Sequence, residues 1–378
     1  MPNIFDKLKI RDVTLRNRLV VSPMCEYSST DGFANDWHLV HLGSRAVGGA
    51  ALVFTEATAV TAAGRISPQD LGIYKDEHIE MLARITRFLS EQGAVPGMQL
   101  AHAGRKGSTR VPWETPGAVP LNDGGWVPVA PTAVAFAPTY PMPKALDAAG
   151  IRGVVRAFAA AANRALEAGF AVLEIHSAHG YLLHEFLSPV SNQRTDSYGG
   201  SLENRTRLLR EVVEAVREVW PENYPLFVRV SSTDWLDGNA WDAEQSVYLA
   251  KILRTLGVDL IDCSSGGIAP GVKIPMGPGY QVQFAERIRR EAEILTGAVG
   301  LITEAKQADA IVREGKADLV IVAREFLRNP YWPLDAATEL GSSQSWPVQY
   351  LRAAADRTPR REPAEVAAPK HGIRAVSR

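Results

Sequence analysis

The chain has 378 residues, 46% of them apolar, and a formal net charge of −1 from 41 basic and 42 acidic side chains. It can bury a large core, and it has no Lys/Arg-rich block, no apolar run long enough to span a bilayer and no visible secretion signal, so neither nucleic acid nor a membrane is an expected partner. Its two cysteines, Cys25 and Cys263, lie far apart in the sequence, which argues against a disulfide framework and predicts a cytoplasmic protein.

Alternating strand and helix patterns run along the chain. Residues 7–15 alternate around a turn at Arg11 and Asp12 and predict a small hairpin at the bottom of the fold. Short apolar or β-branched runs predict strands at 18–22, 51–57, 95–100, 171–175, 226–230, 260–263, 298–302 and 319–323. Amphipathic patterns predict helices at 37–47, 79–92, 150–168, 201–220, 243–256, 283–292, 304–313 and 334–340.

Strict alternation of eight strands with helices predicts a closed parallel (β/α)8 TIM barrel, formed as one domain by residues 1–352. The alternative, a doubly wound open sheet, should have a glycine-rich dinucleotide loop after its first strand, and residues 22–27 are not of that kind. Residues 110–146 are rich in Pro and Gly and too long for an ordinary connection, which predicts a lid over the active face. Residues 353–378 lack an apolar period, and we expect a disordered tail there.

The run 174–181 carries the clearest functional signal, because His176, His179 and Tyr181 follow directly on a predicted strand. Two imidazoles can hold an oxygen that develops negative charge, and a phenol beside them can supply a proton. Two other interpretations stay open. The histidines could be ligands of a catalytic metal, although the helical spacing and the intervening Glu of zinc proteases are missing, or they could be structural residues at a barrel rim.

In a barrel the active site lies at the carboxyl ends of the strands, so the side chains at those ends should converge. These ends offer the amide of Gln99 and the guanidinium of Arg229, but no pair of carboxylates suited to glycoside cleavage. Backbone N–H groups near Gly300 and Ala323–Arg324 could form the phosphate site that many barrels have. The set predicts a pocket for a large, planar, anionic ligand.

Five segments of the chain resemble the old yellow enzyme family, and specifically its second, thermophilic-like subclass of FMN-dependent ene-reductases and xenobiotic reductases. They are 22–27, 99–106, 176–181, 187–205 and 347–352, and they occur in the family's order. The long segment through Asn204 and Arg205 is hard to obtain by chance. Cys25 with Tyr27 marks the subclass, since classical members carry threonine at the cysteine's place.

The resemblance implies FMN as the cofactor and NADPH or NADH as the reductant. Arg229 would contact N1 and the C2 carbonyl of the ring, where a fixed guanidinium stabilises the negative charge of the reduced form. The alternative for Arg229 is a salt-bridged core arginine. Ala323 stands where relatives often have glycine. The full set of implied cofactor contacts is Ser22, Pro23, Met24, Cys25, Ala57, Gln99, Arg229, Gly300, Ala323 and Arg324.

The resemblance also implies catalytic roles. His176 and His179 would donate hydrogen bonds to the carbonyl or nitro oxygen of the substrate, so that its β-carbon accepts hydride from the flavin. Tyr181 would then deliver a proton to the α-carbon, and Tyr27 would add a second donor to the same oxygen.

Three further residues have implied roles. Lys106 would place a positive charge near the flavin face, although a solvated lysine is the simpler interpretation from the sequence alone. Cys25 would tune the flavin's potential, or else it is a buried, inert thiol. Arg352 would reach across a dimer interface into the neighbouring subunit's pocket, unless it caps its own barrel's last helix.

The sequence thus predicts an FMN-dependent NAD(P)H:enone oxidoreductase that works by ping-pong hydride transfer as a homodimer or homotetramer and has no metal. Two alternatives remain: a metal-dependent barrel lyase or hydrolase, and a flavin-binding sensor whose chemistry has lapsed. Because a sensor needs no proton donor, Tyr181 argues against the lapsed form. Two distant cysteines cannot form the four-cysteine iron–sulfur motif of larger relatives.

Overall fold

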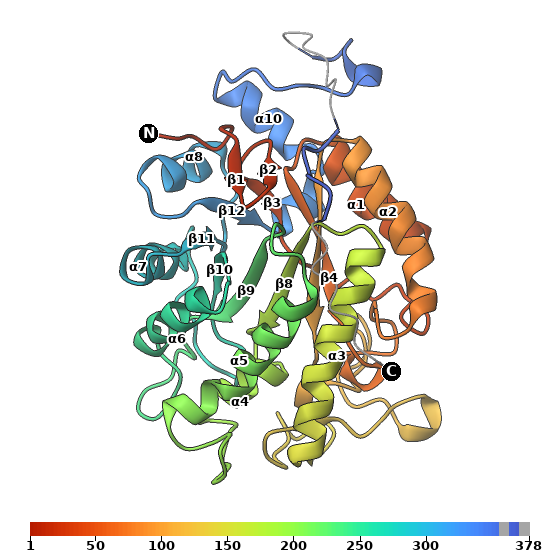
Figure 1. Cartoon of the computed structure of the whole chain (residues 1–378), viewed down its shortest axis with the longest axis vertical. Helices are drawn as coiled ribbons and strands as arrows, with labels where there is room; N and C mark the ends of the chain where they lie inside the picture. The colour runs from red at the N-terminus through yellow and green to blue at the C-terminus, as the bar shows by residue number, and fades with distance from the viewer. Residues whose placement is uncertain (355–362, 370–378) are drawn as a thin grey trace.

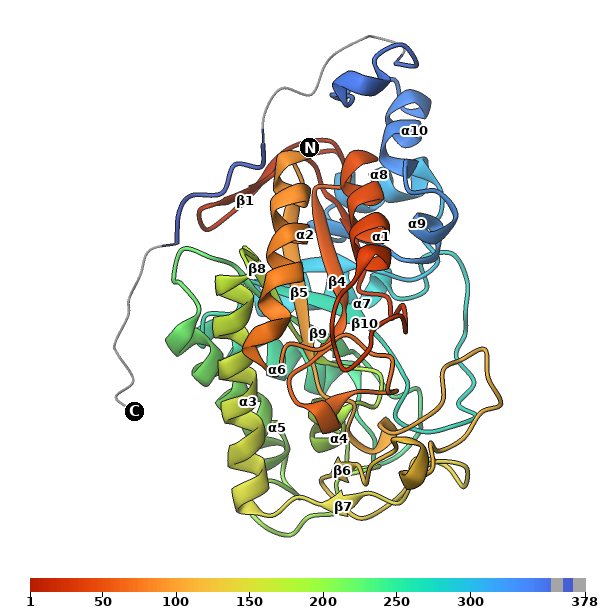
Figure 2. The ribbon, with the colours of Figure 1, turned by 90° about the vertical axis from the view of Figure 1, so that its right-hand side faces the viewer.

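Eight parallel strands form a closed barrel in the computed structural model, which describes residues 1–354 and 363–369. Each strand pairs with the next along the chain, and the last pairs with the first, so the predicted (β/α)8 barrel is confirmed (Figures 1 and 2). The strands are β3 (Leu19–Val21), β4 (Leu52–Ala59), β5 (Val95–Ala101), β8 (Val172–Ser177), β9 (Leu226–Ser231), β10 (Leu260–Ser264), β11 (Leu295–Ala298) and β12 (Leu319–Val322).

Helices cover the outside of the barrel (Figure 1). Their buried apolar side chains belong to one hydrophobic core with those of the strands. Side chains of Asn35, Asp147, Ser201 and Asp242 accept hydrogen bonds from the first backbone N–H groups of four of these helices, which explains where they begin. The eight helices that the sequence predicts are α1 (Asp36–Val47), α2 (Ile79–Glu91), α3 (Ala148–Glu167), α5 (Leu202–Val219), α6 (Ala243–Thr255), α7 (Val282–Ala292), α8 (Ala305–Arg313) and α10 (Trp332–Glu339).

One strand lies elsewhere than predicted. The apolar run 298–302 was expected to be the seventh strand, but β11 spans Leu295–Ala298. The backbone of Gly300 has φ +122° and that of Leu301 φ +51°, so the chain leaves the extended conformation in the middle of the apolar run. Gly300 therefore lies in the loop beyond the strand and not within it.

The bottom of the barrel is closed by the predicted hairpin of β1 (Leu8–Ile10) and β2 (Val13–Leu15), which turns at Arg11. Residues 363–369 lie along this hairpin. The carbonyl of Glu365 accepts the N–H of Thr14 at 3.2 Å, and the N–H of Ala364 donates to Ser90 at 3.1 Å. These contacts were not expected, because residues 353–378 were predicted to be disordered, and of that tail residues 355–362 and 370–378 lie outside the described residues.

At the opposite end of the barrel, residues 110–146 form a long loop, as predicted from its length and composition (Figure 2). The loop includes a short parallel pair, β6 (Val129–Ala130) with β7 (Lys144–Ala145). Two short helices near this end, α4 (Leu182–Leu187) and α9 (Arg324–Arg328), were not predicted. Within residues 1–354 and 363–369, no helix has the combined length and apolar character that crossing a membrane requires.

Candidate active site

The three side chains of the predicted catalytic run meet at the carboxyl end of β8. His176 is the last but one residue of the strand, so it lies inside β8 and not beyond it. Its Nε2 is 3.3 Å from Nδ1 of His179, and the two rings are perpendicular, with centroids 5.1 Å apart. The ring of Tyr181 lies 5.0 Å from that of His176. Two imidazole nitrogens and a phenol thus face one small region.

The turn that presents these groups is held from several sides. His179 has φ +58° and Gly180 has φ +72°, conformations that non-glycine residues rarely adopt. The N–H of His179 donates to Oγ of Ser231 at 2.9 Å, and Nζ of Lys106 donates to the carbonyl of His179 at 2.7 Å. A Cβ on Gly180 would lie 2.1 Å from the carbonyl oxygen of Gly267, so only glycine fits there.

Burial sets the protonation of the three groups. Burial, and then the nearby Arg229, lowers the pKa of both His176 and His179 well below the usual range, so both rings are neutral at neutral pH. Nδ1 of His176 accepts the N–H of Ala178, which leaves its proton on Nε2, facing His179. Burial raises the pKa of Tyr181, which therefore keeps its proton.

A polar layer lies inside the barrel beneath this region. Nε of Arg229 is 3.2 Å from Oδ2 of Asp262, and its Nη1 donates to Oγ of Ser22 at 3.1 Å. Nε2 of Gln99 donates to Oε1 of Glu174 at 2.7 Å. Burial raises the pKa of the carboxyl groups of Glu174 and Asp262, whereas the positive charge of Arg229 opposes that rise. Arg229 is therefore ion-paired in the core, yet it also lies among the predicted cofactor contacts.

These residues fit a flavin mononucleotide. Since Glu174 takes the amide hydrogen of Gln99, the carbonyl oxygen of Gln99 is available to accept the ring N–H, beside the positive charge of Arg229. Gly300 provides a tight cradle, where a Cβ would come within 2.9 Å of Gln281. Ala323 directly precedes α9, and the first N–H groups of a helix have no intrahelical partner, as a phosphate requires.

The other predicted cofactor contacts lie around the same end of the barrel. Ala57 and Gln99 are partners across β4 and β5, beside an irregularity in the pairing. The N–H of Ser22 donates to the carbonyl of Val322 at 2.9 Å, which joins the ends of the first and last barrel strands. Pro23, Met24 and Cys25 follow as half-buried residues, and Arg324 is exposed at the start of α9.

Lys106 is not a solvated lysine, which corrects the simpler interpretation of the sequence. Its Nζ donates to the carbonyls of His179 and Gly267, and it lies 4.2 Å from the ring centroid of Phe136 and 5.6 Å from that of Tyr181. Burial lowers its pKa to about 8. Phe136 comes from the long loop and was not recognised in the sequence.

Tyr27 and Cys25 are adjacent to each other at the exit of β3. Tyr27 has φ +48° and its ring packs edge-on against Trp113 of the long loop at 5.7 Å. Burial raises the pKa of Tyr27, as it does that of Cys25, whose thiol is further discouraged from ionising by Asp70 and Glu56. The phenol of Tyr27 and the thiol of Cys25 are therefore protonated and neutral, and each can donate a hydrogen bond.

The structure also bears on Arg352 and on the alternative of a metal site. Arg352 is exposed on the segment that follows α10. Helix α10 lies far from α4, at the other end of the molecule (Figures 1 and 2). In the part of the chain that is described, no group of three or more His, Cys, Asp or Glu residues is arranged to hold a metal ion. The metal-dependent alternative therefore gains no support from His176 and His179.

Several residues of the site were missed in the sequence. Glu174 and Asp262 were read as parts of buried strands, although a carboxylate within such a strand is itself a signal of a polar site. Ser264 lies at the end of β10, and its Oγ is 2.7 Å from Nε2 of His179. No local pattern links it to that histidine.

Comparisons with known proteins agree with this geometry. Residues 3–342 match the family described as NADH:flavin oxidoreductase / NADH oxidase. The chain is 51% identical to the NADPH dehydrogenase of Geobacillus sp. (strain WCH70) over 92% of this chain and 98% of that protein, and 48% identical to that of Bacillus subtilis (strain 168) over the same shares.

Solved structures give the same result. Morphinone reductase in complex with tetrahydroNAD is similar at a TM-score of 0.75 and 27% identity, covering 92% of this chain and 93% of that one. The old yellow enzyme homologue from Zymomonas mobilis has a TM-score of 0.75 at 26% identity, covering 91% and 94%. These findings confirm the prediction of an FMN-dependent NAD(P)H oxidoreductase of the old yellow enzyme type. The chain belongs to the NADH:flavin oxidoreductase / NADH oxidase family.

Proposed function

We propose that the protein reduces the activated C=C bond of α,β-unsaturated carbonyl and nitro compounds, including xenobiotic ones, with NADPH or NADH as the reductant. The observation that carries this proposal is the convergence of Nε2 of His176 and Nδ1 of His179, 3.3 Å apart, beside the ring of Tyr181. A single substrate oxygen placed against both nitrogens would leave the neighbouring carbons near the phenol.

Gln99, Arg229, Gly300 and Ala323 would hold FMN, which when bound would supply the hydride chemistry with NAD(P)H as the reductant. The neutral imidazoles of His176 and His179 hold the substrate's oxygen and stabilise the negative charge that develops on it. Tyr181 holds its proton until the α-carbon can accept it, because burial keeps the phenol from ionising earlier. Tyr27, which follows β3, donates a second hydrogen bond to the substrate's oxygen. The half-buried Lys106 adds positive charge while its Nζ stays hydrogen-bonded to the carbonyls of His179 and Gly267.

The cofactor is directly testable. Flavin released by heat from the purified protein should be FMN, because the site offers one phosphate cradle, at Gly300 and Ala323, and the chain has no dinucleotide fingerprint. Chromatography of the supernatant against FMN and FAD standards measures this. Recovery of FAD as the bound species would contradict the assignment.

We also propose that the protein acts as a homodimer or a homotetramer in the cytoplasm, where its two free cysteines would remain reduced. Arg352 is exposed, which leaves its guanidinium available to a neighbouring subunit, and we infer that it contributes to that subunit's pocket. Arg352→Ala should raise the Michaelis constant for the enone about 10-fold, the cost of one hydrogen bond from a charged group. Steady-state kinetics at saturating NADPH measures this.

The matched control is truncation after Ala354, which keeps Arg352 but removes the contacts of residues 363–369 with the hairpin. It should lower thermal stability and leave the Michaelis constant unchanged. Truncation after Leu340 should weaken the oligomer and raise the Michaelis constant together. A monomeric and fully active protein truncated after Leu340 would show that no neighbouring subunit contributes to the site.

A further inference from the structure

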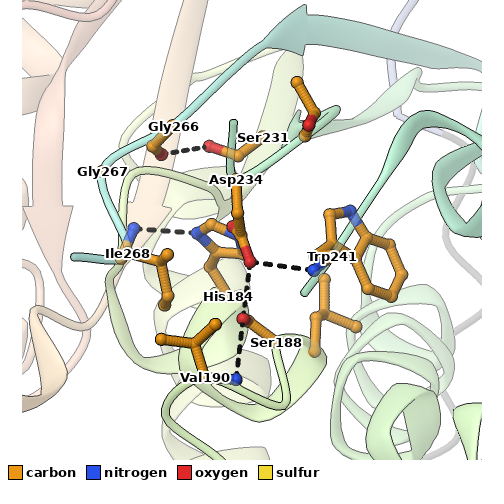
Figure 3. A network of polar contacts seen from close by, with 12 residues as sticks. His184, Ser188, Val190, Ser231, Asp234, Trp241, Gly266, Gly267 and Ile268 are labelled. Carbon is orange, nitrogen blue, oxygen red and sulfur yellow. Dashed lines mark hydrogen bonds and ion pairs between the residues drawn. The ribbon is translucent and has the colours of Figure 1, made fainter. Parts of the chain in front are cut away.

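A buried histidine and aspartate, His184 and Asp234, face each other beside Ser188 and Trp241 (Figure 3), and the histidine is hydrogen-bonded to the turn at Gly180. His184 belongs to α4, Asp234 follows β9, and both side chains are completely buried. Nε2 of His184 is 3.0 Å from Oδ1 of Asp234, and Nδ1 of His184 accepts the backbone N–H of Gly180 at 2.9 Å. The pair thus links a carboxylate to the residue between His179 and Tyr181.

The direction of every hydrogen bond in this network is fixed. The N–H of Gly180 can only donate, so Nδ1 of His184 carries no proton. The N–H of Trp241 donates to Oδ2 of Asp234 at 2.9 Å, and the hydroxyl of Ser188 donates to the same oxygen at 2.6 Å. Only an ionised Asp234 and a neutral His184 with its proton on Nε2 satisfy all of these contacts.

The electrostatic surroundings agree with an ionised Asp234. Burial favours the neutral carboxyl, but the hydrogen bonds from His184 and Ser188 outweigh it, and the pKa of Asp234 lies below the usual range. A buried carboxylate with this many donors is costly to replace.

We propose that Asp234 and His184 are positioning residues, which set the orientation of the turn and so hold His179 and Tyr181 in their productive places. The inference rests on the proposed function of these two side chains. Asp234 accepts the proton-bearing Nε2 of His184 as a hydrogen-bond donor. Nδ1 of the same ring therefore stays unprotonated and can accept the N–H of Gly180.

Asp234→Asn tests the inference with a nearly isosteric change. The N–H of Trp241 requires a carbonyl oxygen, so the new amide must turn its NH₂ group toward His184. Nε2 must then accept, the proton moves to Nδ1, and two donors face each other at Gly180. The displaced turn should slow reduction of an enone by the FMN-loaded, prereduced enzyme about 100-fold, the cost of a misplacement near 1 Å.

Ser188→Ala is the matched control, because it removes one hydrogen bond to Oδ2 but leaves the carboxylate and the contact with Trp241. It should lower the thermal midpoint, while the enone rate stays within about 3-fold of the parent, since the two hydrogen bonds lost, the one to Asp234 and the one accepted from the N–H of Val190, lie away from the turn. Nitrogen NMR of the His184 ring should report a proton on Nε2 in the parent and in Ser188→Ala, and on Nδ1 in Asp234→Asn.

A second pair of variants covers the case in which Asp234→Asn does not fold. In His184→Asn the amide oxygen can still accept from Gly180, whereas in His184→Gln the longer amide can reach Asp234 but not Gly180. Each variant loses one contact, so both should be less stable than the parent enzyme. Only His184→Gln should reduce enones much more slowly than the parent. Equal loss in the two variants, or a parent-like rate in Asp234→Asn with the proton on Nδ1, would overturn the inference. A parent enzyme that binds FMN but reduces no enone would instead contradict the proposed function.

Discussion

Replacing His176 and His179 together with Ala should slow reduction of an enone by the prereduced enzyme about 100-fold to 10,000-fold, the range expected when the groups that stabilise a developing oxyanion are lost. Their facing nitrogens are 3.3 Å apart, and in the proposed function both contact the same substrate oxygen. We therefore expect each single variant to lose much of the rate and the double variant to lose less than the product of the two. Stopped-flow measurement of flavin reoxidation gives these rates.

The same variants distinguish a role of His176 and His179 in the enone step from a general loss of function. Reduction of the flavin by NAD(P)H should suffer less than the enone step, and binding of phenol-type ligands, whose oxygen resembles that of the substrate, should weaken. Losses that multiply would place the two histidines at independent sites. Stoichiometric zinc in the parent protein, lost in the double variant, would replace this assignment with a metal site.

Tyr181→Phe should slow turnover with an enone about 100-fold or more, while nitro compounds should be spared. The change removes the proton donor but keeps the ring that packs 5.0 Å from His176. An enone product requires a proton at its α-carbon, whereas a reduced nitro compound can leave as a stabilised nitronate. Parallel steady-state assays with one enone and one nitroalkene measure the contrast.

Tyr27→Phe is the comparison for this test, because Tyr27 is assigned to the substrate's oxygen and not to its α-carbon. Its loss should weaken turnover of both substrate types in parallel. If Tyr181→Phe also lowered both rates equally, then Tyr181 would position substrates and would not protonate them.

The barrel could be predicted because its signal is periodic and long. Seven of the eight strands were placed within about two residues, the ordinary uncertainty of element ends. The seventh was misplaced because Gly300 and Leu301 turn the backbone inside an apolar run, and hydrophobicity does not report φ. The helices α4 and α9 span too few residues for a 3.6-residue period to be visible.

The catalytic turn could also be predicted from the sequence, because His176, His179 and Tyr181 lie within six consecutive residues. Their supporting partners could not. Ser264 at the end of β10 and Asp234 in the segment after β9 lie far from the turn in sequence, and the pairing of β8 with β9 and of β9 with β10 brings them within hydrogen-bond distance of His179 and His184. A single sequence contains no information on which residues pair across the fold, so the chemistry was predictable and the geometry behind it was not.

The closure of the barrel also has a consequence for how the protein is made. β3 is the first barrel strand to leave the ribosome and β12 the last, yet the two are hydrogen-bonded neighbours. One edge of β3 therefore stays without its partner throughout translation. A nascent chain that stops before Leu319 leaves unpaired edges on both β3 and β11, and such edges are templates for association with other chains. Incomplete translation products of this protein would therefore expose strand edges that chaperones can shield from other chains.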